Sequence, residues 1–305
     1  MKDMLTFFFA GAMLMQGQHN HPESTPKPVE LQEDLGNHTH PIATNSLLAQ
    51  KFFDQGLALI FGFNHDEAAR LFARAAELDP QSPMPHWGIA LALGPNYNMP
   101  PQPEREGKAW LAISKAIELS RGAQENERAY VEALIKRYSK DPNEDRKKLA
   151  VLYKDEMKGI MQRYPDDLDA ATLYAEALMN LRPWQLWSSD GEPAEGTLEI
   201  LEVLEGVLRR DPNHPGANHY YIHAVEASRN PERGLPSAMR LGSLMPGAGH
   251  IVHMPSHIYL RTGDTELSAS PIKEDVKKNT LPSTGGRENY RLGVQPFSTA
   301  SGLLG

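Results

Sequence analysis

The chain shows a helical periodicity of apolar residues from about residue 44 onward. In a series of segments, apolar residues recur at three- and four-residue intervals, the spacing that places side chains on one face of a helix. No stretch alternates apolar and polar residues with hairpin turns, so almost no sheet is predicted. The clearest helical segments are residues 66–78, 109–119, 125–138, 147–163, 168–181 and 197–210.

One of these segments belongs to a helix pair with a repeat pattern. The amphipathic stretch from Asp66 to Leu78 is ended by Asp79-Pro80, because proline disfavours helix in the residue before it. When Pro80 closes a 34-residue unit, small and aromatic residues fall where tetratricopeptide repeats carry them. Small residues at a helix crossing let two helices pack closely. The matching residues are Gly56, Ala68, Phe72 and Ala75.

The chain thus resembles bacterial tetratricopeptide-repeat (TPR) proteins, in particular an exported type with two paired-histidine stretches. These stretches are His-Tyr-Tyr-Ile-His from His219 and His-Met-Pro-Ser-His from His253. The resemblance covers roughly residues 44–264 and implies an all-α fold, a right-handed α-solenoid of degenerate TPR-like helix pairs. Second helices end near residues 80, 120, 165, 212 and 246, and only the last interval, 34 residues, is a clean repeat. The resemblance brings no established activity, so no catalytic residue carries over.

The segments that flank the repeat region lack its periodicity. Residues 1–17 contain Lys2 and an apolar run from Met4 to Met15, which is typical of a signal peptide and too short to span a bilayer. Residues 18–43 hold four prolines and are expected to form a disordered linker. Residues 265–305 are expected to be a disordered or truncated tail. These features predict a periplasmic or secreted protein, or a cytoplasmic one if the apolar start is not a signal peptide.

Composition restricts the partners and the chemistry. The net charge is −8 and the basic residues are scattered, so no nucleic-acid-binding surface is expected. There is no cysteine, so a metal site would have to use His, Asp or Glu. The chain has neither a phosphate-binding Gly-Lys-Ser/Thr loop nor a Gly-x-Ser-x-Gly elbow. Once a signal peptide is removed, no other segment is apolar enough to anchor the chain in a membrane.

The clean repeat interval contains a concentration of histidine. Three of the twelve histidines lie within residues 249–257, and His219 and His223 precede His253 and His257 by 34 residues each. The repeat resemblance implies that the second, fifth, ninth and twelfth positions of a unit face the concave surface. In the units that start at residues 215 and 249, these are Gly216, His219, His223 and Glu226, and His250, His253, His257 and Leu260.

Two classes of function remain open for this groove. It could bind a peptide or partner protein, as solenoids commonly do, with the histidines as structural or ligand-contacting groups. Alternatively, imidazoles spaced by four residues on neighbouring helices could hold a metal, zinc or copper, in a hydrolase or oxidase. The first-choice ligands are His219, His223, His253 and His257, with His250 as the spare. Glu226 would be a ligand, an acceptor that orients an imidazole, or the general base of a metalloenzyme.

Other polar and aromatic residues give less specific indications of function. Tyr97, Trp184 and Trp187 lie in the long connections 94–104 and 182–196, and they either line the groove or cover an apolar gap between repeats. Pro255 could bend the histidine-bearing helix or begin it. Among the other histidines, His65 and His86 are expected to be structural, and His19, His21, His38 and His40 are expected to be solvated or weakly metal-binding.

Overall fold

The computed structural model of the chain describes residues 28–141, 143–264 and 267. All regular structure in these residues is helical, apart from two isolated bridges, so the predicted all-α class is confirmed. Two short 3-10 helices, η1 (Ser120–Gly122) and η2 (Pro231–Gly234), join the longer elements. The α-helices are α1 (Leu47–Phe61), α2 (His65–Leu78), α3 (Pro83–Leu93), α4 (Pro103–Leu119), α5 (Glu125–Ile135), α6 (Arg146–Arg163), α7 (Leu168–Met179), α8 (Thr197–Arg210), α9 (Pro215–Val225), α10 (Leu235–Leu244), α11 (Gly249–His253) and α12 (Pro255–Thr262).

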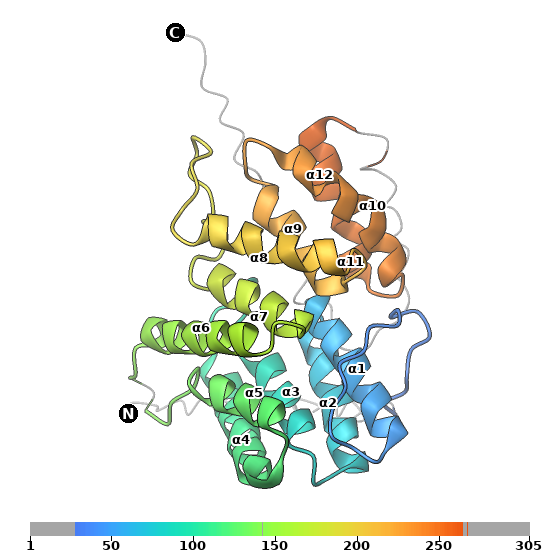
Figure 1. Ribbon diagram of the computed structural model, residues 1–305, viewed down its shortest axis with the longest axis vertical. Coiled ribbons are helices and arrows are strands. Elements are labelled where there is room, and N and C mark those ends of the chain that lie inside the picture. Colours follow the sequence, from blue (N-terminus) through green and yellow to red (C-terminus); the bar gives the residue numbers. More distant parts are fainter. Residues whose placement is uncertain (1–27, 142, 265–266, 268–305) are drawn as a thin grey trace, which may run out of the picture.

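Consecutive helices pack against one another along the chain, from α1 on α2 to α9 on α10 (Figure 1). This succession of helix pairs is the architecture of an α-solenoid. The array also makes long-range contacts: α1 packs on α9, and α9 packs on α7 and α12. The first helix of the first pair therefore touches the first helix of the fifth pair. None of the helices in the described residues has the length and apolar character needed to cross a membrane.

Element boundaries follow the local signals. Helix α2 ends at Leu78, before Asp79-Pro80, and α8 spans the whole predicted segment 197–210. The start of α4 lies earlier than the periodicity indicates, because Pro103 takes the first helical position, where its missing N–H has no partner to lose. Helix α5 ends at Ile135, three residues before the predicted end at 138.

The described part of the expected linker, residues 28–43, is packed rather than disordered. Leu35 and Ile42 are buried, and side chains of α1 and α5 bind the backbone amides of this segment. The linker prediction was therefore wrong here: prolines exclude a helix, but they leave apolar side chains and backbone amides that can still be anchored. The amide donors and their acceptors are His40 to Asp54 at 2.9 Å, Ile42 to Gln50 at 3.0 Å and Ala43 to Glu127 at 2.6 Å. The predicted signal peptide, residues 18–27 and the predicted tail (apart from Leu267) lie outside the described residues.

Phe72 of α2 fills the junction of the first three helices. Its ring is fully buried between Gly56 of α1 and Gly88 of α3. A Cβ atom added at Gly56 would lie 2.7 Å from this ring, and one added at Gly88 would lie 2.5 Å from it. The small residue that the repeat pattern places at position 56 is thus required by packing, and Gly88 has the same role.

Substituting Gly88 with alanine is expected to destabilise the fold by about 1–3 kcal/mol, the usual cost of overpacking a core. The matched control is Gly159→Ala in α6, where an added Cβ meets nothing within 4 Å. That change should stabilise the chain by about 0.5–1 kcal/mol through helix propensity. Urea unfolding of both variants checks the prediction, and equal stabilisation by the two substitutions would contradict it.

Candidate metal centre

All six residues predicted as metal ligands meet where α9 contacts α11 and α12. Helix α9 carries two of the imidazoles, and its C-cap is the carboxylate. Helix α11 carries two more, and α12, which begins at Pro255, carries the last. Met254 between these two helices keeps helical backbone angles, so Pro255 interrupts the hydrogen bonding without placing the preceding histidines on a loop. The six residues are His219, His223, Glu226, His250, His253 and His257.

The five imidazole rings form one continuous group. The ring centroids of His219 lie 4.9 Å from those of both His223 and His250. The His257 centroid lies 5.8 Å from that of His223 and 5.0 Å from that of His253. The repeat register therefore places these side chains on a common face, as the spacing predicts.

Contact with α1 sets the tautomer of His219. Its Nδ1 lies 2.6 Å from the carbonyl oxygen of Phe61, and a carbonyl can only accept, so Nδ1–H is the donor. Phe61 is the last residue of α1, where helix carbonyls lack partners within the helix. Gly216 allows this approach, because a Cβ added there would lie 2.5 Å from the Phe61 ring. The Nε2 atom of His219 is left with a lone pair.

Glu226 orients two further imidazoles. One oxygen accepts from Nδ1 of His223 at 2.8 Å, and the other accepts from Nδ1 of His257. Burial alone would raise the pKa of Glu226, but the hydrogen bonds and charges of His223 and His257 outweigh it and lower the pKa to about 2. Of the three roles considered for Glu226, its contacts supply orientation, and the lowered pKa makes it a weaker base than an ordinary carboxylate.

The Nε2 atom of His223 is buried and has no hydrogen-bond partner among the described residues. The residue is 2% exposed, so this ring nitrogen has lost water without gaining a hydrogen-bond partner. Ligand atoms of His219, His223 and His250 all lie within 4.8 Å of one another, and the Nε2 atoms of His219 and His250 are 3.1 Å apart. A second such triple comprises His223, Glu226 and His257. His253, a first-choice ligand, belongs to neither triple, whereas the spare, His250, belongs to the first.

Three of the imidazoles, those of His219, His250 and His253, have a lowered pKa that favours the neutral form. Burial, followed by the proximity of other imidazoles, lowers the pKa of His219 and His250 well below its ordinary value. The same two causes lower the pKa of His253 to about 4. Neutral imidazole is the form that binds metal ions.

Three aromatic rings surround His223. Phe63 and Trp184 have φ angles of 55° and 62°, and they are the described non-glycine residues with positive φ. Their ring centroids lie 5.7 and 5.5 Å from that of His223, and the centroid of buried Tyr97 lies 5.4 Å away. Such backbone strain tends to be concentrated at functional sites. Tyr97 and Trp184 thus border the imidazole cluster, and Phe63, which follows Gly62 in a turn, was missed because turn position alone does not reveal it.

Trp184 and Trp187 differ in role although both belong to the 182–196 connection. Trp187 is partly buried, and its indole N–H donates to the Ala224 carbonyl at 2.8 Å, which ties the connection to α9. Trp184 remains 52% exposed. Trp187 therefore anchors the loop, and Trp184 presents its ring beside the imidazole cluster.

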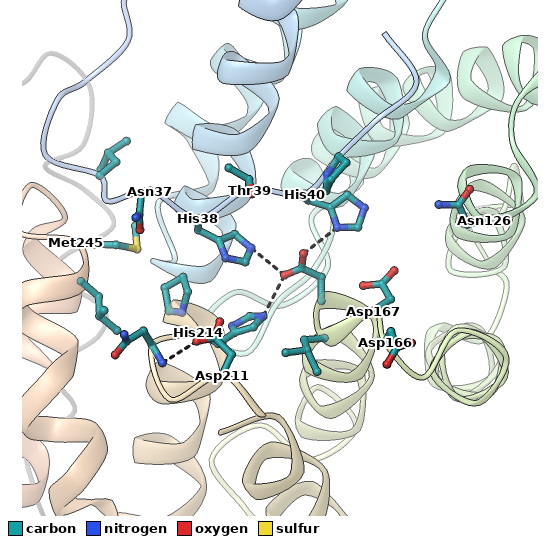
Figure 2. Close-up of a pocket in the computed structure, with 17 residues that line it drawn as sticks. Asn37, His38, Thr39, His40, Asn126, Asp166, Asp167, Asp211, His214 and Met245 are labelled. Atoms are coloured by element: carbon teal, nitrogen blue, oxygen red, sulfur yellow. Dashed lines mark hydrogen bonds and ion pairs between the residues drawn. The ribbon is translucent and has the colours of Figure 1, made fainter. Parts of the chain in front are cut away.

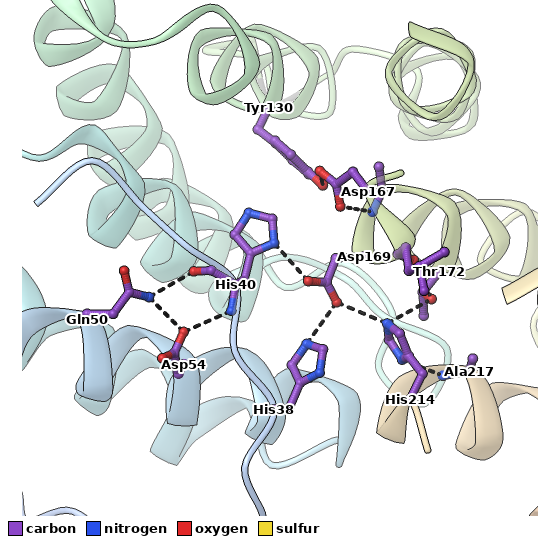
Figure 3. A network of polar contacts seen from close by, with 12 residues as sticks. His38, His40, Gln50, Asp54, Tyr130, Asp167, Asp169, Thr172, His214 and Ala217 are labelled. Atoms are coloured by element: carbon purple, nitrogen blue, oxygen red, sulfur yellow. Dashed lines mark hydrogen bonds and ion pairs between the residues drawn. The ribbon is translucent and has the colours of Figure 1, made fainter. Parts of the chain in front are cut away.

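A second polar cluster, which the sequence did not predict, surrounds Asp169 at the start of α7 (Figures 2 and 3). One Asp169 oxygen accepts from Nε2 of His38 at 2.9 Å and from Nε2 of His214 at 3.1 Å, and the other accepts from Nδ1 of His40 at 2.8 Å. These side chains line a cavity of about 700 Å³. The interpretation of His38 and His40 as parts of a flexible arm was wrong, because an anionic side chain from a distant helix binds both.

In the Asp169 cluster, the histidines donate hydrogen bonds to the carboxylate, which is the pattern of a buried ion pair rather than of a metal site. Nδ1 of His214 accepts the backbone N–H of Ala217 at 3.2 Å, so its Nε2 carries the proton and donates to Asp169. No lone pair of His214 then faces the carboxylate. Burial opposes ionisation of Asp169, but its histidine partners lower its pKa well below the ordinary value. Burial likewise opposes protonation of His38 and His40, but Asp169 raises the pKa of both.

Comparison with known proteins gives no family assignment. No protein-family model matches the chain, and no curated protein matches it significantly. Among solved structures, YrrB, a TPR protein with an unusual peptide-binding site, is 15% identical over 74% of this chain and 92% of its own, with a TM-score of 0.31. MamA (residues 41 to the end) from Desulfovibrio magneticus RS-1 is 14% identical over 77% and 97%, also with a TM-score of 0.31. Solved neighbours thus include a member of the class that the sequence resembles, while the fold description rests on the helix contacts of this chain itself.

The Asp169→Asn substitution is expected to destabilise the chain by about 3 kcal/mol, because it removes one partner of a buried ion pair. The loss should depend on pH. Histidines with raised pKa contribute fully below pH 6.5 and lose that contribution as pH rises through the raised values. The lowered pKa of Asp169 contributes above pH 3.8 and is lost as pH falls through the lowered value.

Thermal unfolding of the wild type and Asp169→Asn from pH 4 to pH 9 checks this prediction. The difference in stability should be largest between pH 3.8 and 6.5 and should shrink above that range. The acidic groups near His40 that also raise its pKa are Asp54 and Asp167. A difference independent of pH would mean that the histidines bind Asp169 in their neutral form.

Proposed function

We propose that this chain is a metal-binding helical-repeat protein whose imidazole cluster holds a zinc or copper ion. The observation that carries the proposal is the buried, unpartnered Nε2 of His223 in a group whose ligand atoms, from His219, His223 and His250, lie within 4.8 Å of one another. Histidines that bind metals almost always donate their other ring N–H to a carboxylate or a carbonyl. His219 and His223 both have this arrangement, through Phe61 and Glu226. Imidazole ligands without cysteine suit zinc or copper.

His219, His223 and His250 are the proposed ligands of this ion. In a tetrahedral zinc site with Zn–N bonds of about 2.0–2.1 Å, ligand nitrogens lie about 3.3 Å apart. The Nε2 atoms of His219 and His250 are 3.1 Å apart, so a small outward movement would admit an ion. Three imidazoles leave a fourth position for water or a substrate oxygen, as in catalytic zinc sites. Hydrolysis is the reaction class that such an open position permits, and Glu226 would act in it by holding the ligands.

The His223→Ala substitution is expected to abolish zinc binding by His219, His223 and His250. The Glu226→Gln substitution is expected to weaken zinc binding by about 10–100-fold, the usual effect of losing a group that orients a ligand. His86→Ala is the matched control, because His86 lies on α3 and belongs to neither cluster. Isothermal titration with zinc, together with elemental analysis of the purified chain, measures both effects. Zinc affinity no tighter than millimolar in the wild type would refute the proposal.

Peptide binding is the second candidate, and the way the chain holds its own residues 28–43 favours it. Gln55 of α1 bonds both the N–H and the C=O of Gln32, at 3.0 and 2.5 Å. Gln50 bonds the C=O of His40 at 2.8 Å and the N–H of Ile42 at 3.0 Å. These side-chain amides recognise backbone rather than a particular sequence. A partner peptide could therefore occupy the same face of α1 if residues 28–43 left it.

A chain lacking residues 1–43 is expected to bind a synthetic peptide of residues 28–43, while the full chain, whose own segment competes, should bind it much more weakly. Fluorescence anisotropy of the labelled peptide measures both affinities, with circular dichroism to confirm that the shortened chain remains helical. A peptide whose order is scrambled is the control. Equal binding of the two peptides to the shortened chain would argue against a specific peptide-binding face.

A further inference from the structure

The imidazole cluster divides into two sets of neighbouring side chains. The first set consists of His219, His223 and His250. The second is the pair His253 and His257, whose Nε2 atoms are 3.1 Å apart, the same separation as that of His219 and His250. Among the described residues, no group of three or more mutually close ligand atoms includes His253. One ion bound by all five imidazoles therefore does not fit this arrangement.

One imidazole of the second set, His257, has the same supporting contact as His223 in the first. Nδ1 of His257 donates to Glu226, just as Nδ1 of His223 does, so in the neutral form of either ring the lone pair lies on Nε2. His253 and His257 are four residues apart on α11 and α12, which places their rings on one face, edge to face, with centroids 5.0 Å apart. Glu226 consequently holds one imidazole of each set, with a different oxygen for each.

The two sets differ in their access to solvent. The His223 side chain is 1% exposed, whereas that of His257 is 22% exposed. A pair of imidazoles leaves at least two coordination positions vacant in a tetrahedral site. An ion bound by the second set would therefore complete its coordination with water or with a small anion from solution.

We propose, on the basis of the function proposed above, that the cluster holds two ions of the zinc or copper class. The first is bound by His219, His223 and His250, and the second is bound by His253 and His257 at the exposed edge. Glu226 links the two subsites, because its carboxylate orients one ligand of each. The second ion has more open positions than the first and lies nearer to solvent, which makes its subsite the entry point for an anionic or oxygen-bearing substrate.

The test is the zinc stoichiometry of the full chain after it is stripped with a chelator and dialysed to equilibrium against zinc. The wild type is expected to bind two zinc ions, the second more weakly because it has fewer protein ligands. His253→Ala is expected to retain one. His86→Ala, the matched loss of a histidine outside the cluster, should retain two. Circular dichroism confirms the helical content of each variant, and His253→Gln replaces the alanine variant if that one does not fold.

The possible results separate this inference from the proposed function. No zinc in the wild type overturns both. One zinc in the wild type that persists in His253→Ala overturns the second subsite and leaves the first standing; the 3.1 Å contact of His253 and His257 is then an ordinary imidazole–imidazole hydrogen bond. One zinc in the wild type that is lost in His253→Ala means a single shared ion, which also overturns the inference. The wild-type stoichiometry alone distinguishes one ion from two, even if a variant fails to fold.

Discussion

The site depends above all on the contact between the end of α1 and the middle of α9. These helices are more than 150 residues apart in the chain, yet the Phe61 carbonyl that α1 leaves without a helical partner accepts the Nδ1–H of His219 at 2.6 Å. Gly216 makes the approach possible, and the turn after α1 brings the Phe63 ring against His219 and His223. The Phe61 carbonyl thereby links α1 to α9 and determines that Nδ1 of His219 carries a proton. An α1 packed elsewhere would leave His219 free to present either nitrogen.

Two buried carboxylates gather histidines in this chain, and they do so with opposite chemical results. Glu226 accepts Nδ1–H groups, so the Nε2 atoms of His223 and His257 lie on the far sides of their rings, where that of His223 has no partner among the described residues and that of His257 lies 3.1 Å from Nε2 of His253. Asp169 accepts the Nε2–H groups of His38 and His214, so the proton-bearing ends of these rings converge on the anion. The first arrangement suits a cation that lies beyond the imidazoles. In the second, the carboxylate itself is the centre of the cluster, and the histidines supply the positive charge.

The sequence predicts the helices well because each boundary has a local cause, such as Asp79-Pro80 after α2. It also predicts the face shared by His219, His223 and His257, because a 34-residue repeat transfers position from one helix to the next. It could not assign His250 to the first set of imidazoles and His253 to the second, since that depends on side-chain directions where α11 ends and α12 begins at Pro255. Nor could it find Asp169, because a cluster that joins residues 38, 169 and 214 has no common period. The signal that was available, two histidines beside Pro41, was outweighed by the proline content of the segment.

Helix α9 connects the two clusters physically. His214, its N-cap, belongs to the Asp169 cluster; His219 and His223 line the imidazole cluster; and Glu226, its C-cap, orients the ligands. Eleven residues of helix thus carry polar contacts from one end to the other, and every residue from Pro215 to Val225 is buried. Burying so many polar groups is costly unless each is paired, so the contacts at both ends hold the helix at one axial position. The docking of residues 28–43 and the geometry of the imidazoles consequently rest on the same rigid element, and a shift of α9 that loosened one would misalign the other.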